Sequence, residues 1–240
     1  MAFLVFQLRA PLASWGDPAV GEYRGSHSYP GESALVGLLG AALGLRREDD
    51  ASHAALSRGY GFAVGVQASG KLLRDYHTAQ VPGRVSLKGR PHATRRDELR
   101  VPKDELNTVL STRDYRQDAA CLVAVQPRDD VPYALEELAG ALKAPRYVLY
   151  LGRKSCPVAA PLFPLIVDAG SALDALNAYR EQLGRLCGRE TPCITQLAWS
   201  DKVEAGLPPD LSVPRKDRLI CRSAWQFGDR AEHVAFIERE

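Results

Sequence analysis

The order of the apolar segments constrains the fold of this chain more than any other feature. The patterns predict a central strand over 3–9, a buried helix over 34–44 and a second strand over 60–66. A third strand is predicted over 119–125, and an amphipathic helix follows over 132–142 with its apolar residues on one face. The order strand, helix, strand, strand, helix predicts an α+β fold of the ferredoxin-like type.

Two long segments interrupt this order. Residues 13–32 are crowded with glycine and proline, which predicts a long surface loop. Over 81–112 the apolar periodicity fades, and glycine, proline, basic and polar residues predict an inserted arm or β-hairpin rather than core. Two similar tetrads flank this arm, Arg74-Asp75-Tyr76-His77 and Arg113-Asp114-Tyr115-Arg116. The arm therefore separates the second predicted strand from the third.

Beyond Pro145 the chain changes character, because prolines separate short segments. This composition predicts a smaller, loop-rich region over 146–240 that follows a first domain over 1–145. Within it the patterns predict a helix over 168–186 and a terminal pair of strands over 218–224 and 233–239. The fold prediction is therefore a ferredoxin-like domain with an inserted arm, plus a smaller C-terminal β-rich region.

Positive charge is concentrated in two parts of the chain. The net charge is only +2, but between Lys71 and Arg116 eleven basic residues stand against six acidic ones. A second, acid-free run comprises Lys143, Arg146, Arg153 and Lys154. Such clusters suit a polyanion partner, although solvated surfaces commonly show the same pattern. Charge alone therefore gives only weak support for RNA binding.

The bulk composition is that of a globular protein, with 240 residues of which 45% are hydrophobic and 25% charged. There is no window of 18 apolar residues and no basic leader of a signal peptide, so we expect a soluble, cytoplasmic protein without a membrane partner. The five cysteines are irregularly spaced and include no C-x-x-C pair, which favours neither disulfides nor zinc. We expect no cofactor and no bound metal.

The common catalytic motifs are absent from the sequence, which has no P-loop, no G-x-G-x-x-G, no H-E-x-x-H and no G-x-S-x-G. His77 is the best-placed histidine, because Tyr76 and Arg74 lie beside it. A metal-independent ribonuclease needs such groups for acid–base catalysis. We favour the alternative, in which Tyr76 stacks on a base and His77 makes a structural hydrogen bond.

Two further patterns have both a structural and an RNA-binding interpretation. Residues 58–62 fit the start of a ribonucleoprotein signature, but Tyr60 and Phe62 share one strand face with later apolar residues, which favours a core-facing stripe. In the helix over 34–44, Gly37 and Gly40 allow a neighbour to approach closely. Close packing on the sheet is favoured over a phosphate cradle, because these glycines lie inside the helix rather than at its N-terminus.

Several short stretches become recognisable when they are taken together and in order. They are LRAPLASWG at 8–16, SALVGLLGA at 33–41, RDYHT at 74–78, RDY at 113–115, PRY at 145–147 and YLGRKSCP at 150–157. A terminal Trp225-Gln226-Phe227 segment follows a basic run. Over nearly its whole length the chain resembles the CasD family, which comprises subunits of type I-E CRISPR Cascade complexes and belongs to the RAMP superfamily.

This resemblance implies an RNA-recognition-type, ferredoxin-like domain with a protruding thumb at about 81–112. It implies a subunit that binds the 5′ handle of the guide RNA (crRNA), caps the backbone filament and contacts the backbone and large subunits. In antiviral defence, such a subunit meets target DNA through the assembled ribonucleoprotein complex. In type I-E systems a different subunit cuts the precursor RNA, so the resemblance implies a non-catalytic chain.

Two other functions remain open at this point. Relatives in type I-C systems cleave the repeat, which keeps a metal-independent endoribonuclease as the alternative. The other open function is that of a protein-only adaptor whose basic arm binds an acidic partner.

The candidate RNA-binding residues fall into two sets. Those in stretches that match the family are Arg74, Tyr76, His77, Arg113, Arg146, Tyr147, Arg153 and Lys154. Those chosen by charge alone, on the arm, are Arg84, Lys88, Arg90, Arg95 and Arg96. We expect Tyr76 or Tyr147 to stack on a base, and Arg113 and Arg146 to bind phosphate. Arg153 and Lys154 have an alternative role, which is to fold back onto helix ends or carboxylates.

Overall fold

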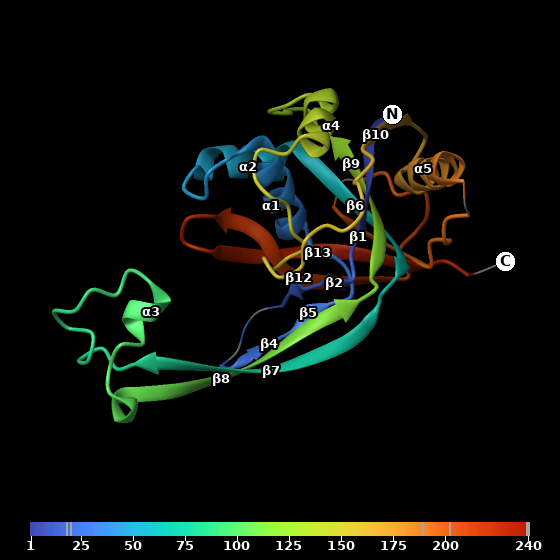
Figure 1. Cartoon of the computed structure of the whole chain (residues 1–240). Coiled ribbons are helices and arrows are strands. Elements are labelled where there is room, and N and C mark those ends of the chain that lie inside the picture. The colour runs from blue at the N-terminus through green and yellow to red at the C-terminus, as the bar shows by residue number, and fades with distance from the viewer. Residues whose placement is uncertain (18, 20, 189, 202, 239–240) are drawn as a thin grey trace.

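The computed structural model describes residues 1–17, 19, 21–188, 190–201 and 203–238. Its centre is a seven-stranded antiparallel sheet with the strand order β10-β1-β9-β6-β11-β13-β12 (Figure 1). The strands are β1 (Ala2–Arg9), β6 (Tyr60–Ala68), β9 (Ala120–Pro127), β10 (Leu165–Asp168), β11 (Gln196–Ser200), β12 (Leu211–Cys221) and β13 (Gln226–Phe236). The chain is a mixed α/β protein whose sheets are mostly antiparallel.

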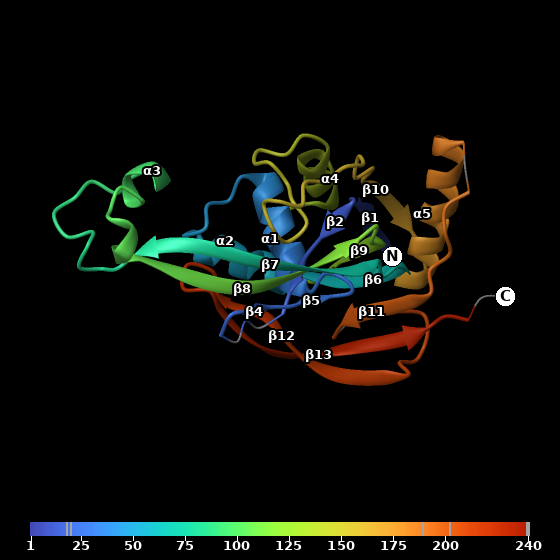
Figure 2. The ribbon, with the colours of Figure 1, turned by 60° about the horizontal axis from the view of Figure 1, so that its bottom comes forward.

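Both faces of the sheet centre are buried. In β1, Leu4 and Phe6 point to one face while Phe3 and Val5 point to the other, because side chains alternate along a strand. Three helices cover the first face and one covers the second: α1 (Glu32–Leu43), α2 (Asp50–Gly59) and α4 (Leu135–Lys143), and opposite them α5 (Ala172–Cys187). Figure 2 shows α5 on the side of the sheet away from α1. The centre of the sheet therefore lies between two helical layers.

The stripe on β6 faces the core, as favoured from the sequence. Tyr60, Phe62, Val64 and Val66 are no more than 4% exposed and pack beneath the α1, α2 and α4 layer. The hydroxyl of Tyr60 also contacts the carbonyl of Tyr133. The resemblance to a ribonucleoprotein signature at 58–62 therefore reflects core packing.

Helix α1 confirms the buried helix, but its glycines contact different groups from those predicted. The helix ends where Gly44 takes a left-handed φ of 82°. A Cβ added to Gly37 would lie 3.0 Å from Arg222, and one added to Gly40 would lie 2.7 Å from His53. These close neighbours are side chains from other elements, so the prediction of close packing against the sheet was wrong.

The arm is a long β-hairpin that extends from the body (Figures 1 and 2). Strands β7 (Lys71–Pro82) and β8 (Leu106–Gln117) pair from Lys71 with Gln117 to Pro82 with Leu106. Its tip holds a short helix, α3 (Arg95–Glu98), and a single turn, η1 (Lys103–Glu105). The hairpin strands extend beyond the predicted 81–112 on both sides. Most of β7 is exposed, so it lacks the apolar alternation from which strands are predicted.

Much of the predicted surface loop over 13–32 lies along the base of the arm. Four two-residue strands form there: β2 (Leu12–Ala13), β3 (Trp15–Gly16), β4 (Tyr23–Arg24) and β5 (Ser26–His27). Strands β2 and β4 both pair with β8, and β3 pairs with β5. Residues 18 and 20 of this loop lie outside the described residues.

The C-terminal part of the chain joins the same sheet as the rest. Strand β10 pairs with β1 at one edge, whereas β11, β13 and β12 extend the sheet beyond β6 at the other. The predicted pair over 218–224 and 233–239 was displaced: β12 and β13 each begin seven residues earlier, and residues 222–224 lie in the turn between them. Residue 239 lies outside the described residues. Strands from both sides of residue 145 share one sheet. The domain division at this residue stays a prediction. No helix within the described ranges is long and apolar enough to cross a membrane.

Candidate nucleic-acid interface

A groove of about 1280 Å³ opens beside helix α1. Its lining comes from α1, from the loop over 147–154, from the β12–β13 hairpin and from residues around Trp15. The floor on α1 comprises Leu38 and the small residues Ser33, Ala34, Gly37 and Ala41. Because four of these five side chains are short, a bound chain can approach the helix closely beside the Arg222 side chain, which lies over Gly37.

The lining combines aromatic rings with positive charge. The aromatic side chains Tyr147, Tyr150 and Trp225 are between 39% and 51% exposed, so their rings are accessible to a ligand. The charged lining residues are Arg47, Lys154, Arg215, Lys216 and Arg222 on the basic side, and Asp17 and Asp217 on the acidic side. Grooves that bind single-stranded nucleic acid combine these same features, since cations contact phosphates and rings stack on bases.

The turn of the β12–β13 hairpin forms one rim of this groove. The guanidinium groups of Arg47 and Arg222 lie 4.4 and 4.5 Å from the ring centroid of Trp225. Asp50, the first residue of α2, fixes the turn, because its carboxylate accepts hydrogen bonds from the backbone N–H groups of Arg222 (2.7 Å) and Ser223 (2.9 Å). The Ser223 hydroxyl also donates to Asp50 (2.6 Å), and these bonds lower the pKa of its carboxyl to about 2.

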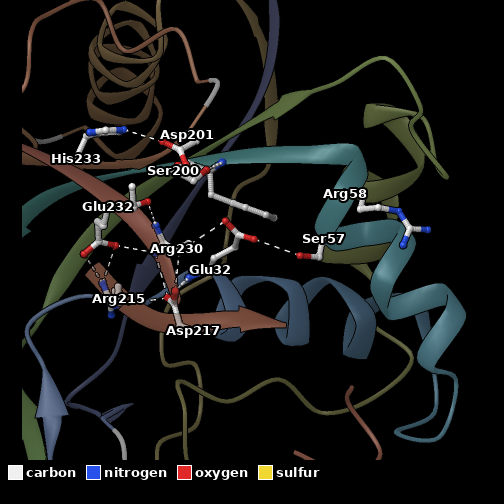
Figure 3. Close-up of polar contacts among 12 residues, drawn as sticks. Glu32, Ser57, Arg58, Ser200, Asp201, Arg215, Asp217, Arg230, Glu232 and His233 are labelled. Atoms are coloured by element: carbon white, nitrogen blue, oxygen red, sulfur yellow. Dashed lines mark hydrogen bonds and ion pairs between the residues drawn. The ribbon is translucent and has the colours of Figure 1, made fainter. Parts of the chain in front are cut away.

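A buried ion cluster fastens this hairpin to α1 (Figure 3). Its members are Arg215 and Asp217 on β12, Arg230 and Glu232 on β13, and Glu32 on α1. Arg230 lies 2.6 Å from Asp217 and 2.7 Å from Glu232, and Arg215 lies 2.9 Å from Glu232. The backbone N–H of Glu32 donates to Asp217 at 2.8 Å, and burial raises the pKa of the Glu32 carboxyl. The cluster therefore joins the floor of the groove to its rim.

A second polar cluster joins the arm to the body. Asp114 on β8 is buried, and its carboxylate accepts two hydrogen bonds from Arg74 on β7, at 2.9 and 3.1 Å. The Tyr23 hydroxyl donates a third at 2.6 Å. The bonds from Arg74 are the main reason that the pKa of Asp114 lies below its usual range. Arg153 contacts the same region, with its guanidinium 4.9 Å from the Tyr115 ring centroid.

Sequence comparison decides the family of the chain. A family model described as CRISPR-associated protein (Cas_Cas5) matches residues 3–231. The chain belongs to the CRISPR-associated Cas5 family. One member, the CRISPR system Cascade subunit CasD of Escherichia coli (strain K12), is 32% identical over 223 residues, which cover 90% of this chain and 92% of the relative. The resemblance to CasD drawn from the sequence is confirmed.

Solved structures share the fold of this Cas5-family chain. A chain of a CRISPR RNA-guided surveillance complex superposes with a TM-score of 0.63 and 25% identity, covering 98% of this chain and 90% of its own length. A crystal structure of a Cas protein gives a TM-score of 0.59 at 24% identity, with 98% and 94% covered. The second likeness concerns the fold alone.

The predicted site residues of the Cas5-family chain do not come together in one place. Nine lie on the arm: Arg74, Tyr76, His77, Arg84, Lys88, Arg90, Arg95, Arg96 and Arg113. Four lie in the segment after α4: Arg146, Tyr147, Arg153 and Lys154. From both sets, only Tyr147 and Lys154 line the groove. The backbone N–H groups of Arg146 and Tyr147 donate to the last turn of α1, which holds this segment against the helix.

On the arm, Tyr76 and His77 point to opposite faces, because they are consecutive residues of strand β7. Tyr76 is 65% exposed and lies across from Thr112, whereas His77 lies across from Ser111. Arg74 shares the Tyr76 face and is bound to Asp114. Tyr76 and His77 are therefore not positioned to act together on one bond as acid and base.

Several other predicted residues make contacts within the protein. Arg153 donates to the carbonyl of Arg24 at 3.1 Å and lies over the Tyr115 ring. It therefore folds back onto the protein, but onto a backbone carbonyl and an aromatic ring rather than onto a helix end or a carboxylate. At the tip of the arm, Arg90 donates to the carbonyl of Arg100, and Arg95 pairs with Glu98. Arg84, Lys88 and Arg96 are exposed.

Four basic groove residues were missed from the sequence: Arg47, Arg215, Lys216 and Arg222. Trp225 was noted only as part of the family resemblance. The sequence did contain a signal, since a W-Q-F segment follows the basic run over 215–222. Arg47 lies far from that run in the sequence, so no local pattern indicates that Arg47 lies close to Arg222 and Trp225.

Proposed function

We propose that this Cas5-family chain is a subunit of a Cascade complex that binds the 5′ handle of the guide RNA and caps the backbone filament without cutting RNA. The groove beside α1 carries the proposal, because its exposed rings and its excess of cations suit a single strand of nucleic acid. The relatives support it: the E. coli protein is named as a Cascade subunit, and the first solved structure is of an RNA-guided surveillance complex.

The strand order supports a ferredoxin-like unit within this fold. Strands β10, β1, β9 and β6 are adjacent in that order, and α1 and α4 lie in the connections between strands, as in a β-α-β-β-α-β unit. We propose that the β7–β8 hairpin is the thumb of this unit. Because the fourth strand is β10, the unit extends to Asp168, past the boundary predicted at residue 145.

The proposed contacts divide between the groove and the arm. In the groove, Tyr147 and Tyr150 stack on handle bases while Lys154 and Lys216 contact phosphates. On the arm, the exposed residues Arg84, Lys88, Arg96 and Tyr76 contact the guide where it passes to the neighbouring backbone subunit. The chain contacts the large subunit, and target DNA binds to the assembled complex.

Incubation of the purified chain with labelled repeat RNA in EDTA is expected to shift the RNA on a native gel and to leave it intact on a denaturing gel. The physical reason is that the groove supplies phosphate and base contacts, whereas Tyr76 and His77 lie on opposite faces of a strand. His77→Ala should leave both results unchanged. Specific cutting that His77→Ala abolishes would instead make the chain a metal-independent ribonuclease.

A further inference from the structure

Two guanidinium groups meet at one indole ring on the rim of the groove. Arg47 follows α1, and Arg222 lies at the turn between β12 and β13, yet both lie within 4.5 Å of the Trp225 ring centroid. In the part of the chain that the structure describes, neither forms an ion pair with a carboxylate. The pair therefore concentrates positive charge without an acidic partner.

The two charges disfavour each other in the free protein. The pKa of Arg222 is lowered, first by burial and then by the positive charge of Arg47. An anion bound by these groups offsets the repulsion and accepts charge-assisted hydrogen bonds from guanidinium. Arginine suits a phosphate in particular, because its planar group presents paired donors to two phosphate oxygens.

The surrounding structure holds the pair in place. Trp225 takes a left-handed φ of 53°, which is unfavourable for a side chain of this size and is maintained by the turn around it. Asp50 anchors that turn through the backbone N–H groups of Arg222 and Ser223. Gly37 on α1 leaves room for Arg222, since a Cβ there would lie 3.0 Å from its Nη2 atom. Helices α1 and α2 therefore both contribute to the placement of Arg222 in the turn.

We infer that Arg47, Arg222 and Trp225 form a phosphate-binding clamp for the guide RNA, in which Trp225 positions the two arginines. This inference rests on the proposed function and extends it to residues of the hairpin turn. RNA is favoured over an acidic peptide, because the same groove exposes Tyr147 and Tyr150, whose rings suit nucleobases. The small floor of α1 lets the sugar–phosphate backbone lie close to the clamp.

The test is fluorescence anisotropy of the full chain with labelled single-stranded handle RNA over a series of salt concentrations. The double variant Arg47→Gln/Arg222→Gln is expected to bind about tenfold more weakly, as loss of hydrogen bonds to a charged group implies. Its log–log salt slope should be shallower by about 0.7 for one lost phosphate contact. Trp225→Ala should weaken binding although it removes no charge, and Trp225→Phe should restore part of the loss.

Arg218→Gln is the matched control, because this exposed arginine lies on β12 outside the groove lining. Its affinity for the RNA should stay within about twofold of that of the unaltered chain. Its log–log salt slope should stay within about 0.2 of the unaltered value. Thermal melting of each variant confirms that it is folded. If the unaltered chain binds RNA and the clamp variants bind equally well, the inference is wrong while the proposed function stands. An equal loss per removed charge in Arg218→Gln also overturns the inference, because it makes the effect one of total charge.

If the unaltered chain binds no RNA, the proposed function fails and the inference fails with it. Binding of an acidic peptide in place of RNA, lost in the clamp variants, would assign the clamp to a protein partner and overturn its assignment to RNA.

Discussion

Arg230→Met is expected to lower the free energy of unfolding by about 3–5 kcal/mol, the usual cost of removing one partner from a buried ion pair. The Arg230 side chain is 8% exposed and lies within 2.7 Å of carboxylate oxygens of both Asp217 and Glu232. Without it, Glu32 loses the ion pair that it forms with Arg230, and Arg215 alone remains to pair with Asp217 and Glu232. Urea unfolding followed by circular dichroism measures the change as a shift of the midpoint.

The matched control is Arg185→Met on α5. Arg185 pairs with Glu181 at 3.6 Å, but its side chain is 77% exposed. Exposed ion pairs contribute about 0–1 kcal/mol, so this variant should unfold close to the unaltered midpoint. Equal and small shifts for both variants would show that the cluster does not hold the hairpin to α1.

Gly152→Ala is expected to cost about 3 kcal/mol and to weaken RNA binding, because two unfavourable effects act at one residue. Gly152 takes a left-handed φ of 85°, and a Cβ there would lie 1.7 Å from the carbonyl oxygen of Ser14. The loop must therefore move away from Ser14, whose N–H donates to the Leu151 carbonyl. Because the loop carries Lys154 into the groove, handle RNA should bind more weakly. Urea unfolding and anisotropy measure the two effects.

Gly140→Ala serves as the comparison within the same protein. Gly140 lies in helix α4, and a Cβ there meets nothing within 4 Å. Alanine should therefore stabilise the helix by about 0.5–1 kcal/mol and leave RNA binding unchanged. If Gly152→Ala behaves like Gly140→Ala, the loop does not depend on its contact with Ser14.

The parts of the fold that could be predicted are those whose burial shows in the sequence. Strands β1, β6 and β9 are covered by helices, so their apolar runs are nearly continuous. The arm could not be bounded in this way, because β7 is exposed along most of its length and its pairing with β8 uses the backbone. The tetrads at 74–77 and 113–116 overlap in register, with Arg74 across from Asp114 and Asp75 across from Arg113, yet sequence reasoning placed them outside the hairpin.

The C-terminal segments illustrate a second limit. Their prolines indicate short segments, but not which sheet edge those segments join. Strands β10 and β11 pair with β1 and β6, whose outer backbone groups would otherwise lack hydrogen-bond partners. Edge pairing depends on backbone geometry, and therefore leaves little trace in the residue types.

The candidate site was predicted only in part for a related reason. Counting charges pointed to the arm, where basic residues are close in sequence, and the resemblance to CasD added Tyr147 and Lys154. Arg47 and Arg222 become neighbours only after the β12–β13 hairpin folds against α1. A site built from distant segments requires the tertiary structure, because neither residue stands out in its own surroundings.

Ultraviolet cross-linking tests the central claim most directly. The chain would be purified with the other Cascade subunits and a guide RNA, irradiated, and its cross-linked peptides identified by mass spectrometry. The account predicts that nucleotides of the 5′ handle cross-link to the aromatic residues of the groove, Tyr147, Tyr150 or Trp225. A guide that cross-links to the arm alone, or that never co-purifies with the chain, would contradict it.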